Sequence, residues 1–74
     1  MKKILKVEKY YKLLNYHYCT DAINPDKNYR VDLFVDGSII GETPESIVGK
    51  TVECSIYPHE YIASEVKLFG GGDE

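Results

Sequence analysis

The first thirty residues place tyrosines among lysines, and these two residue types together can bind a charged backbone that carries flat rings. Seven of the 74 residues are tyrosines, an unusual share for a chain of this length. Lysine and arginine neutralise phosphates, and aromatic faces stack on bases with little regard to base identity. The pattern therefore favours single-stranded nucleic acid as a ligand. The expected contacts are stacking on Tyr16, Tyr18 and Tyr29 and phosphate binding by Lys27 and Arg30.

A purely structural role for the same residues is a strong alternative. Tyrosines in a small β domain commonly pack in the core or across strands with only the hydroxyl in water, and lysines usually cover a solvated surface. Asp32 and Asp36 share a face with Phe34 in an extended chain, and carboxylates there repel phosphate. Both interpretations stay open from the sequence.

Charge is unevenly distributed along the chain. Up to Arg30, seven basic and three acidic residues give +4, whereas the two basic and nine acidic residues beyond it give −7, for a total of −3. The acidic half, or an exposed strand edge, is the basis of a rival hypothesis. In that hypothesis the chain is a protein-interaction module, an inhibitor or adaptor of the kind that phages and mobile elements encode. Self-association into a homodimer is a third possibility.

The residues that could support catalysis or metal binding are few. His17, Cys19, Cys54 and His59 suffice in number for tetrahedral zinc, but their spacing differs from that of zinc ribbons and fingers. Cys54 lies at an inward position of its strand, where a free cysteine behaves as a small hydrophobic residue. No glycine-rich phosphate loop or activated nucleophile is evident. We therefore expect no enzyme activity, no cofactor and no metal.

Cysteine content and hydropathy point to a cytoplasmic protein. Two cysteines allow at most one disulfide, too few for a secreted disulfide-rich domain. Lys6 and Glu8 interrupt the apolar residues near the N-terminus, and no apolar run approaches membrane-spanning length. We expect no membrane partner.

The second half of the chain has a clear alternating pattern. It predicts a strand over residues 31–36, a tight turn at Asp36-Gly37 and a short returning strand through Ile39 and Ile40. Thr43 is a hydroxyl N-cap for one helical turn that ends at Gly49. Alternation over residues 50–57 and 61–69 predicts two more strands, separated by a turn at 58–60.

The first twenty residues fit two structures. Ile4, Val7, Tyr11, Leu14 and Tyr18 recur at helical spacing. Residues 16–20 are nevertheless poor helix formers that suit a strand. We favour one long, bent strand or two short ones here, followed by a loop over residues 21–28, with an N-terminal helix as the alternative.

The predicted order, a long strand, a hairpin, one helical turn and a second hairpin, resembles the five-stranded OB-type barrel. The resemblance covers residues 1–69 in element order only, with residues 70–74 as a flexible acidic tail. It implies an all-β fold whose ligand lies across the second and third strands, which adds Phe34 to the candidate stacking residues and brings in His59 and Tyr61. An SH3-like barrel and an α+β fold, with an N-terminal helix on a four-stranded antiparallel sheet, are alternatives.

The predicted core is Val7, Leu13, Val31, Leu33, Val35, Ile40, Ile47, Val52, Cys54, Ile56, Ile62, Val66 and Leu68.

Overall fold

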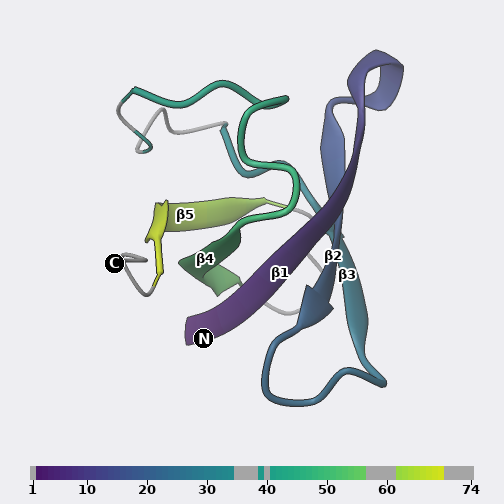
Figure 1. The fold of residues 1–74 in the computed structure, drawn as a ribbon, viewed down its shortest axis with the longest axis vertical. Coiled ribbons are helices and arrows are strands. Elements are labelled where there is room, and N and C mark those ends of the chain that lie inside the picture. Colours follow the sequence, from purple (N-terminus) through teal and green to yellow (C-terminus); the bar gives the residue numbers. More distant parts are fainter. Residues whose placement is uncertain (1, 35–38, 40, 57–61, 70–74) are drawn as a thin grey trace.

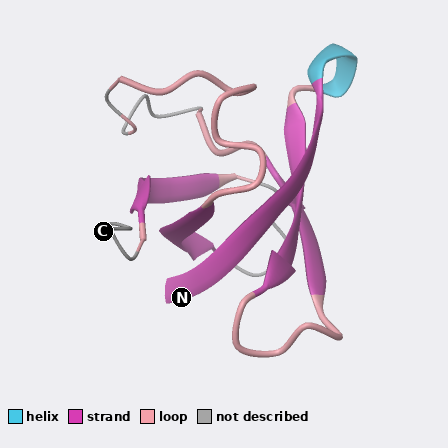
Figure 2. Ribbon diagram, in the orientation of Figure 1, coloured by secondary structure: helices cyan, strands magenta, loops and turns pink. Residues whose placement is uncertain are grey.

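The described residues form a sheet of five antiparallel strands (Figures 1 and 2). The structure, a computed structural model, describes residues 2–34, 39, 41–56 and 62–69. The strands are β1 Lys2–Tyr11, β2 Tyr16–Asp21, β3 Asn28–Val31, β4 Thr51–Ile56 and β5 Ala63–Leu68. Their spatial order is β3-β2-β1-β4-β5, so that the first strand lies at the centre of the sheet. The all-β fold class is confirmed, and within the described residues no helix is long and apolar enough to cross a membrane.

Two strands form from the first twenty residues, so the N-terminal helix is wrong and the two-strand alternative is correct. A 3-10 turn, η1, at Lys12–Leu14 joins β1 to β2. Asn15 closes this turn in the left-handed conformation, at φ 56°, and its N–H donates to the Lys12 carbonyl over 3.3 Å. Asparagine tolerates that conformation better than most residues, so it can end the turn where a hairpin must reverse.

The strand predicted over residues 31–36 is wrong in its bounds. β3 ends at Val31, and bends follow at Leu33 and Phe34, because the Asp32 carboxylate accepts the Phe34 N–H over 3.0 Å and turns the chain locally. Ile39 is buried in a bend rather than in a returning strand. The predicted turn at Asp36-Gly37, together with Val35, Ile40, His59, Tyr61 and residues 70–74, lies outside the described residues.

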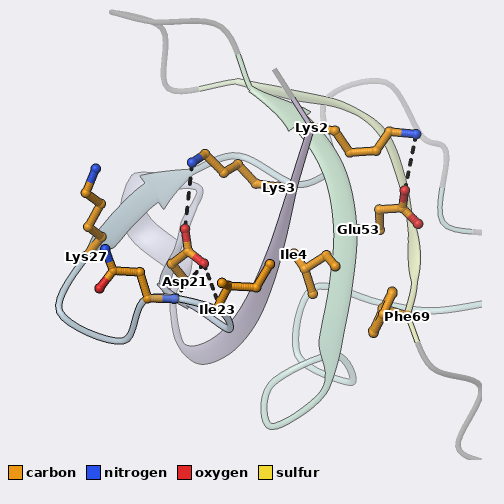
Figure 3. A pocket seen from close by; sticks show the side chains of 9 residues that line it. Lys2, Lys3, Ile4, Asp21, Ile23, Lys27, Glu53 and Phe69 are labelled. Atoms are coloured by element: carbon orange, nitrogen blue, oxygen red, sulfur yellow. Dashed lines mark hydrogen bonds and ion pairs between the residues drawn. The ribbon is translucent and has the colours of Figure 1, made fainter.

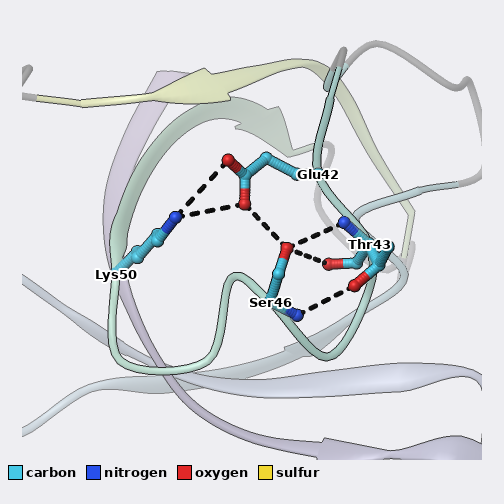
Figure 4. Close-up of polar contacts among 4 residues, drawn as sticks. All are labelled: Glu42, Thr43, Ser46 and Lys50. Atoms are coloured by element: carbon cyan, nitrogen blue, oxygen red, sulfur yellow. Dashed lines mark hydrogen bonds and ion pairs between the residues drawn. The ribbon is translucent and has the colours of Figure 1, made fainter.

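A run of turns over residues 43–50 fills the gap before β4. The hydroxyl cap predicted at Thr43 is present, since Thr43 Oγ1 accepts the Ser46 N–H over 3.0 Å. The Ser46 hydroxyl in turn donates to Glu42, and Lys50 pairs with the same carboxylate over 3.2 Å (Figure 4). Gly49 ends the turns at φ 93° and donates its N–H to the Val7 carbonyl over 2.8 Å. The segment is therefore fastened directly to the central strand.

The last two strands pair with a bulge that alters which side chains point inward. Val52, Cys54 and Ile56 of β4 are buried as predicted. In β5 the register slips opposite Glu53 to Ser55, and Glu65 has a positive φ of 53°. The buried residues of β5 are consequently three apart, Ala63 and Val66, instead of two.

The core lies on one side of the sheet and confirms eight of the predicted positions. These are Val7, Val31, Leu33, Ile47, Val52, Cys54, Ile56 and Val66. Leu13 is wrong because it lies at the tip of the β1–β2 hairpin. Ile62, 49% exposed, is wrong because its neighbour Ala63 takes the inward position at the start of β5. Leu68 pairs with buried Val52 at the end of the outer strand β5, and it is wrong because it is 40% exposed there. Leu5, Cys19, Ile39 and Ala63 are core residues that were not predicted.

The two outer strands of the sheet approach one another without forming a ladder. Asp32, just after β3, and Ile62, just before β5, form an isolated parallel bridge, in which the Ala63 N–H donates to the Asp32 carbonyl over 3.3 Å. Within the described residues the sheet is thus curled towards a barrel and is not closed. We call this contact between Asp32 and Ala63 the seam.

Candidate nucleic-acid interface

The side of β1, β2 and β3 that faces away from the core carries aromatic and cationic side chains. In β2, burial alternates strictly, with His17, Cys19 and Asp21 buried. Tyr16 and Tyr18 therefore point to the opposite side, which we call the outer face. Strand pairing then identifies their neighbours on that face.

One cross-strand row places a tyrosine between two cations. Tyr18 is paired with Lys9 of β1 on one side and with Arg30 of β3 on the other. Adjacent strands lie about 4.8 Å apart, so both cations flank the ring at a short distance. Lys9 and Arg30 are exposed and Tyr18 is half-buried. The row can offer one stacking surface and two phosphate contacts at once.

A bulge at Glu8 brings Lys9 into this row. The register runs Val7 to Cys19 and then Lys9 to Tyr18, so that one extra residue stands in β1. By simple alternation from Val7, Lys9 would point inward, and the extra residue turns it to the outer face. Glu8 itself accepts a hydrogen bond from the Thr20 hydroxyl over 3.0 Å. Its carboxylate is thus partly engaged by its neighbour.

A second row, nearer the hairpin tip, consists of paired tyrosines. Tyr11 and Tyr16 are cross-strand partners, and their ring centroids are 4.9 Å apart at an interplanar angle of 34°. Tyr16 also lines an open hollow with Leu14, Asn15, Arg30 and Asp32. The hollow connects the outer face to the hairpin tip.

Two of the predicted stacking residues lie elsewhere. Tyr29 is paired with Cys19 on the core side and is half-buried against the core, with Lys3 Nζ 5.8 Å from its ring centroid. Phe34 also packs against the core, 5.8 Å from the His17 ring. The structure therefore brings Tyr16, Tyr18 and Arg30 together and separates them from Tyr29 and Phe34.

Lys27 belongs to a different hollow, of about 360 Å³, at the other end of the hairpin (Figure 3). Lys3 pairs there with Asp21 over 3.7 Å. Hydrogen bonds from the Ile23 and Asn24 N–H groups, with help from Lys3, lower the pKa of Asp21 below its ordinary value. Lys27 is thus one of several charges around this hollow and is remote from the outer-face rows.

The structure describes three of the four residues considered as zinc ligands, namely His17, Cys19 and Cys54. Burial raises the pKa of the Cys19 thiol to about 12 and that of Cys54 to about 11, so both free thiols are neutral near pH 7. Neutral thiols are poor metal ligands and poor nucleophiles. His59 lies outside the described residues. Among the described residues no cluster of three metal-ligating side chains occurs.

His17 is a buried polar side chain of β2 that points to the core side, opposite the outer face. It is stacked on Tyr10, with ring centroids 4.6 Å apart, and its Nε2 lies 2.8 Å from the Pro44 carbonyl, a distance at which it donates. Its Nδ1 then carries no proton and has no hydrogen-bond partner. Burial lowers the pKa of His17, against the opposing effects of the Pro44 hydrogen bond and the Asp32 and Glu45 charges.

Lys9 and Tyr11 belong to the two outer-face rows but were not among the site residues predicted from the sequence. Their outward orientation depends on the Glu8 bulge, and nothing in the order of residues 7–11 marks where the extra residue falls. The alternation of tyrosines and lysines in the first thirty residues includes both Lys9 and Tyr11. That pattern does not distinguish side chains that face the core from those on the outer face. Comparison with protein families, curated proteins and solved structures found no match to this chain.

Proposed function

We propose that this chain is a small, non-catalytic binding module for single-stranded nucleic acid, with the outer face as its binding surface. The observation that carries the proposal is the row in which Lys9 and Arg30 flank Tyr18, beside the Tyr11–Tyr16 pair. Bases stack on Tyr18 and Tyr16, and the cations contact the phosphates on either side. This combination suits a single strand because its bases are free to leave their own stack.

The two rows contain two cations, Lys9 and Arg30, and two carboxylates lie beside them. Glu8 accepts the Thr20 hydroxyl, and Asp32, which accepts the Phe34 N–H, lines the hollow with Arg30. Lys6 adds a further cation beside Thr20. Tyr29 and Phe34 have a supporting role in this proposal because they pack against the core, and Lys27 is a peripheral cation.

The strand arrangement supports the same surface. A central first strand between β2 and β4, with the end of β3 bridged in parallel to the start of β5, is similar to the connectivity of OB-type barrels. We propose that the chain is a reduced, incompletely closed version of that fold. Ligands of such barrels lie across the second and third strands, where Tyr16, Tyr18 and Arg30 stand. Two buried, reduced thiols fit the proposed cytoplasmic location.

The test is a fluorescence-anisotropy titration of labelled oligo-dT and its RNA counterpart. A Tyr16→Ala, Tyr18→Ala double variant should bind at least about 30-fold more weakly, since each of the two stacked bases contributes about 1–3 kcal/mol. A Lys9→Ala, Arg30→Ala variant should also bind more weakly and show a shallower dependence of affinity on salt. Circular dichroism establishes that each variant is folded.

A matched charge control is available on β1 and β5. Lys2 and Lys67 both pair with Glu53, away from the two rows. A Lys2→Ala, Lys67→Ala variant removes the same charge and should retain much more affinity than Lys9→Ala, Arg30→Ala. Equal losses in the two variants would mean that net charge, rather than the row, governs binding. Absence of saturable binding at high micromolar protein would refute the proposal.

A protein partner is the second candidate, and exposed apolar residues at the end of β5 favour it. Leu68 and Phe69, at and just beyond the end of the outer strand β5, are 40% and 46% exposed. An apolar patch beside a strand edge can engage another chain, including a second copy of this one. Binding through such a patch should persist when salt is raised, whereas nucleic-acid binding should weaken steeply. Sedimentation velocity at two protein concentrations tests the homodimer.

A further inference from the structure

The tip of the β1–β2 hairpin exposes two consecutive leucines. Leu13 is 97% exposed and Leu14 is 66% exposed, and no residue of η1 is buried. The Asn15 to Lys12 hydrogen bond closes the turn without any contribution from either leucine side chain. Polar residues and glycine are the usual occupants of such turns. The two leucine side chains therefore lower solubility and contribute nothing to the core. Their exposure indicates a contact with a ligand.

The tip continues the outer face. Behind the leucines stands the Tyr11–Tyr16 pair, and Leu14 and Tyr16 line the same hollow as Arg30. In Figure 1 the hairpin projects beyond the rest of the sheet. A strand stacked on Tyr18 and then Tyr16 is thus led towards the leucines. Arg30 and Asp32 put one charge of each sign in the hollow, and Lys12, exposed in the same turn, adds a cation.

We infer that the tip caps the end of a duplex, so that the preferred ligand is a junction between single-stranded and double-stranded nucleic acid. The inference rests on the proposed function and names its substrate class. Leucine offers no aromatic face to a single base, so it is a poorer partner for one than tyrosine. A terminal base pair is a broad, flat, apolar surface, and apolar side chains such as leucine are known to press against base stacks. Leu13 and Leu14 lie on that pair, and Lys12 lies near the duplex phosphates.

The experiment compares three labelled DNA probes: an oligo-dT tail, the same tail attached to a hairpin duplex, and the blunt hairpin alone. The wild-type chain should bind the tailed duplex about tenfold more tightly than the tail, from burial of leucine surface. Leu13→Ser should lose most of this preference and keep its affinity for the tail, because it leaves Leu14 and the hollow beside Tyr16 unchanged. Because the Leu13 side chain is 97% exposed, the variant should fold normally, which its thermal melt establishes.

Ile23→Ser is the matched control. Ile23 is 79% exposed in the loop at the other end of the hairpin, so this variant removes a similar apolar surface away from the outer face. It should keep the full preference for the tailed duplex. A preference that falls equally in Ile23→Ser and in the leucine variant would overturn the inference, because the effect would then be general hydrophobicity.

Other outcomes separate this inference from the proposed function. Equal affinity of the wild-type chain for the tail and the tailed duplex overturns the inference and leaves single-strand binding intact. Weaker tail binding by the leucine variant overturns it too, because the leucines would then belong to the single-strand path. No binding to any probe overturns both proposals. Leucine-dependent sedimentation with phosphatidylserine vesicles, with no junction preference, assigns the tip to a lipid surface and overturns the inference.

Discussion

At the scale of single residues, His17 links the core to the turns before β4. Its Nε2 holds the Pro44 carbonyl, and its unpartnered Nδ1 would become a second N–H donor on protonation. A buried donor without an acceptor is costly, as is a buried charge. The pKa of His17 is therefore lowered from its ordinary value of 6.5, chiefly by burial.

This shift makes stability depend on pH. Because the unfolded chain takes up a proton on His17 before the folded chain does, the contribution to stability is complete above pH 6.5 and is lost as pH falls below it. The carboxylates with lowered pKa values, such as Asp21, lose their contribution at still lower pH. We expect urea unfolding to show a decline in the free energy of unfolding from pH 7 to pH 5.

His17→Gln is the variant that isolates this effect. A glutamine amide can still donate to the Pro44 carbonyl and does not titrate, so the decline between pH 7 and pH 5 should become shallower. His59 is present in both proteins and cancels in the comparison. An unchanged pH profile in the variant would show that another group causes the decline.

Single residues could be predicted where burial follows simple alternation. Val52, Cys54 and Ile56 were placed correctly because β4 keeps strict alternation along its whole length. Tyr29 was expected to be a stacking residue, and it alternates with Arg30 onto the core side. Alternation along the sequence does not by itself indicate which side of the sheet, that of Tyr29 or that of Arg30, faces the core.

At the scale of elements, the turns over residues 43–50 act as a plug in the core. Ile47 is fully buried, as predicted, and its neighbour Val48 is 40% exposed. Ile47→Ala should lower the free energy of unfolding by about 2–4 kcal/mol because it leaves a cavity. Val48→Ala should cost less than about 1 kcal/mol. Urea denaturation of both variants measures the contrast, and similar losses would contradict the plug.

Gly49 sets the backbone direction in which the chain leaves the turns over residues 43–50. Its φ of 93° is strained for other residues, and a Cβ built there would meet no atom within 4 Å. Gly49→Ala should therefore destabilise the chain by about 1–2 kcal/mol through backbone strain alone. Gly49→Asn should be less destabilising, because asparagine tolerates positive φ. Equal stability of the glycine and alanine proteins in thermal melts would rule out this role.

Element types were easier to predict than element registers. Strand-forming residues after Asn15 correctly indicated strands in the first half of the chain. The bulges at Glu8 and Glu65 could not be foreseen, because each depends on a partner strand that fixes the register. The Glu8 bulge accounts for the unexpected position of Lys9, and the Glu65 bulge accounts for the burial of both Ala63 and Val66 in β5.

At the scale of the whole molecule, the seam is the weak point of the curled sheet. One bridge, from the Ala63 N–H to the Asp32 carbonyl, joins the two ends in the described part of the chain. Hydrogen exchange followed by NMR should show the Ala63 amide exchanging at least tenfold faster than the amides of Leu5 and Val7 in the central strand. Equal protection would mean that the seam opens only when the whole molecule unfolds.

The arrangement of the candidate site could be predicted only in part, because it depends on contacts between distant residues. Interleaved tyrosines and cations directed the site prediction to residues that lie in β1, β2 and β3. Which of them share a face is decided by pairings such as Lys9 with Tyr18 and Tyr18 with Arg30. Local propensity does not carry that information.

The central position of β1 also governs the order in which the sheet can form during synthesis. The ribosome makes β1 and β2 first, and they can pair at once as a hairpin because only a short turn separates them. The other edge of β1 must wait for β4, whose pairing runs from Lys2–Ser55 to Lys6–Thr51. A nascent chain therefore carries an open, partly apolar strand edge until β4 leaves the exit tunnel, which gives chaperones or a second nascent copy a defined interval in which to bind.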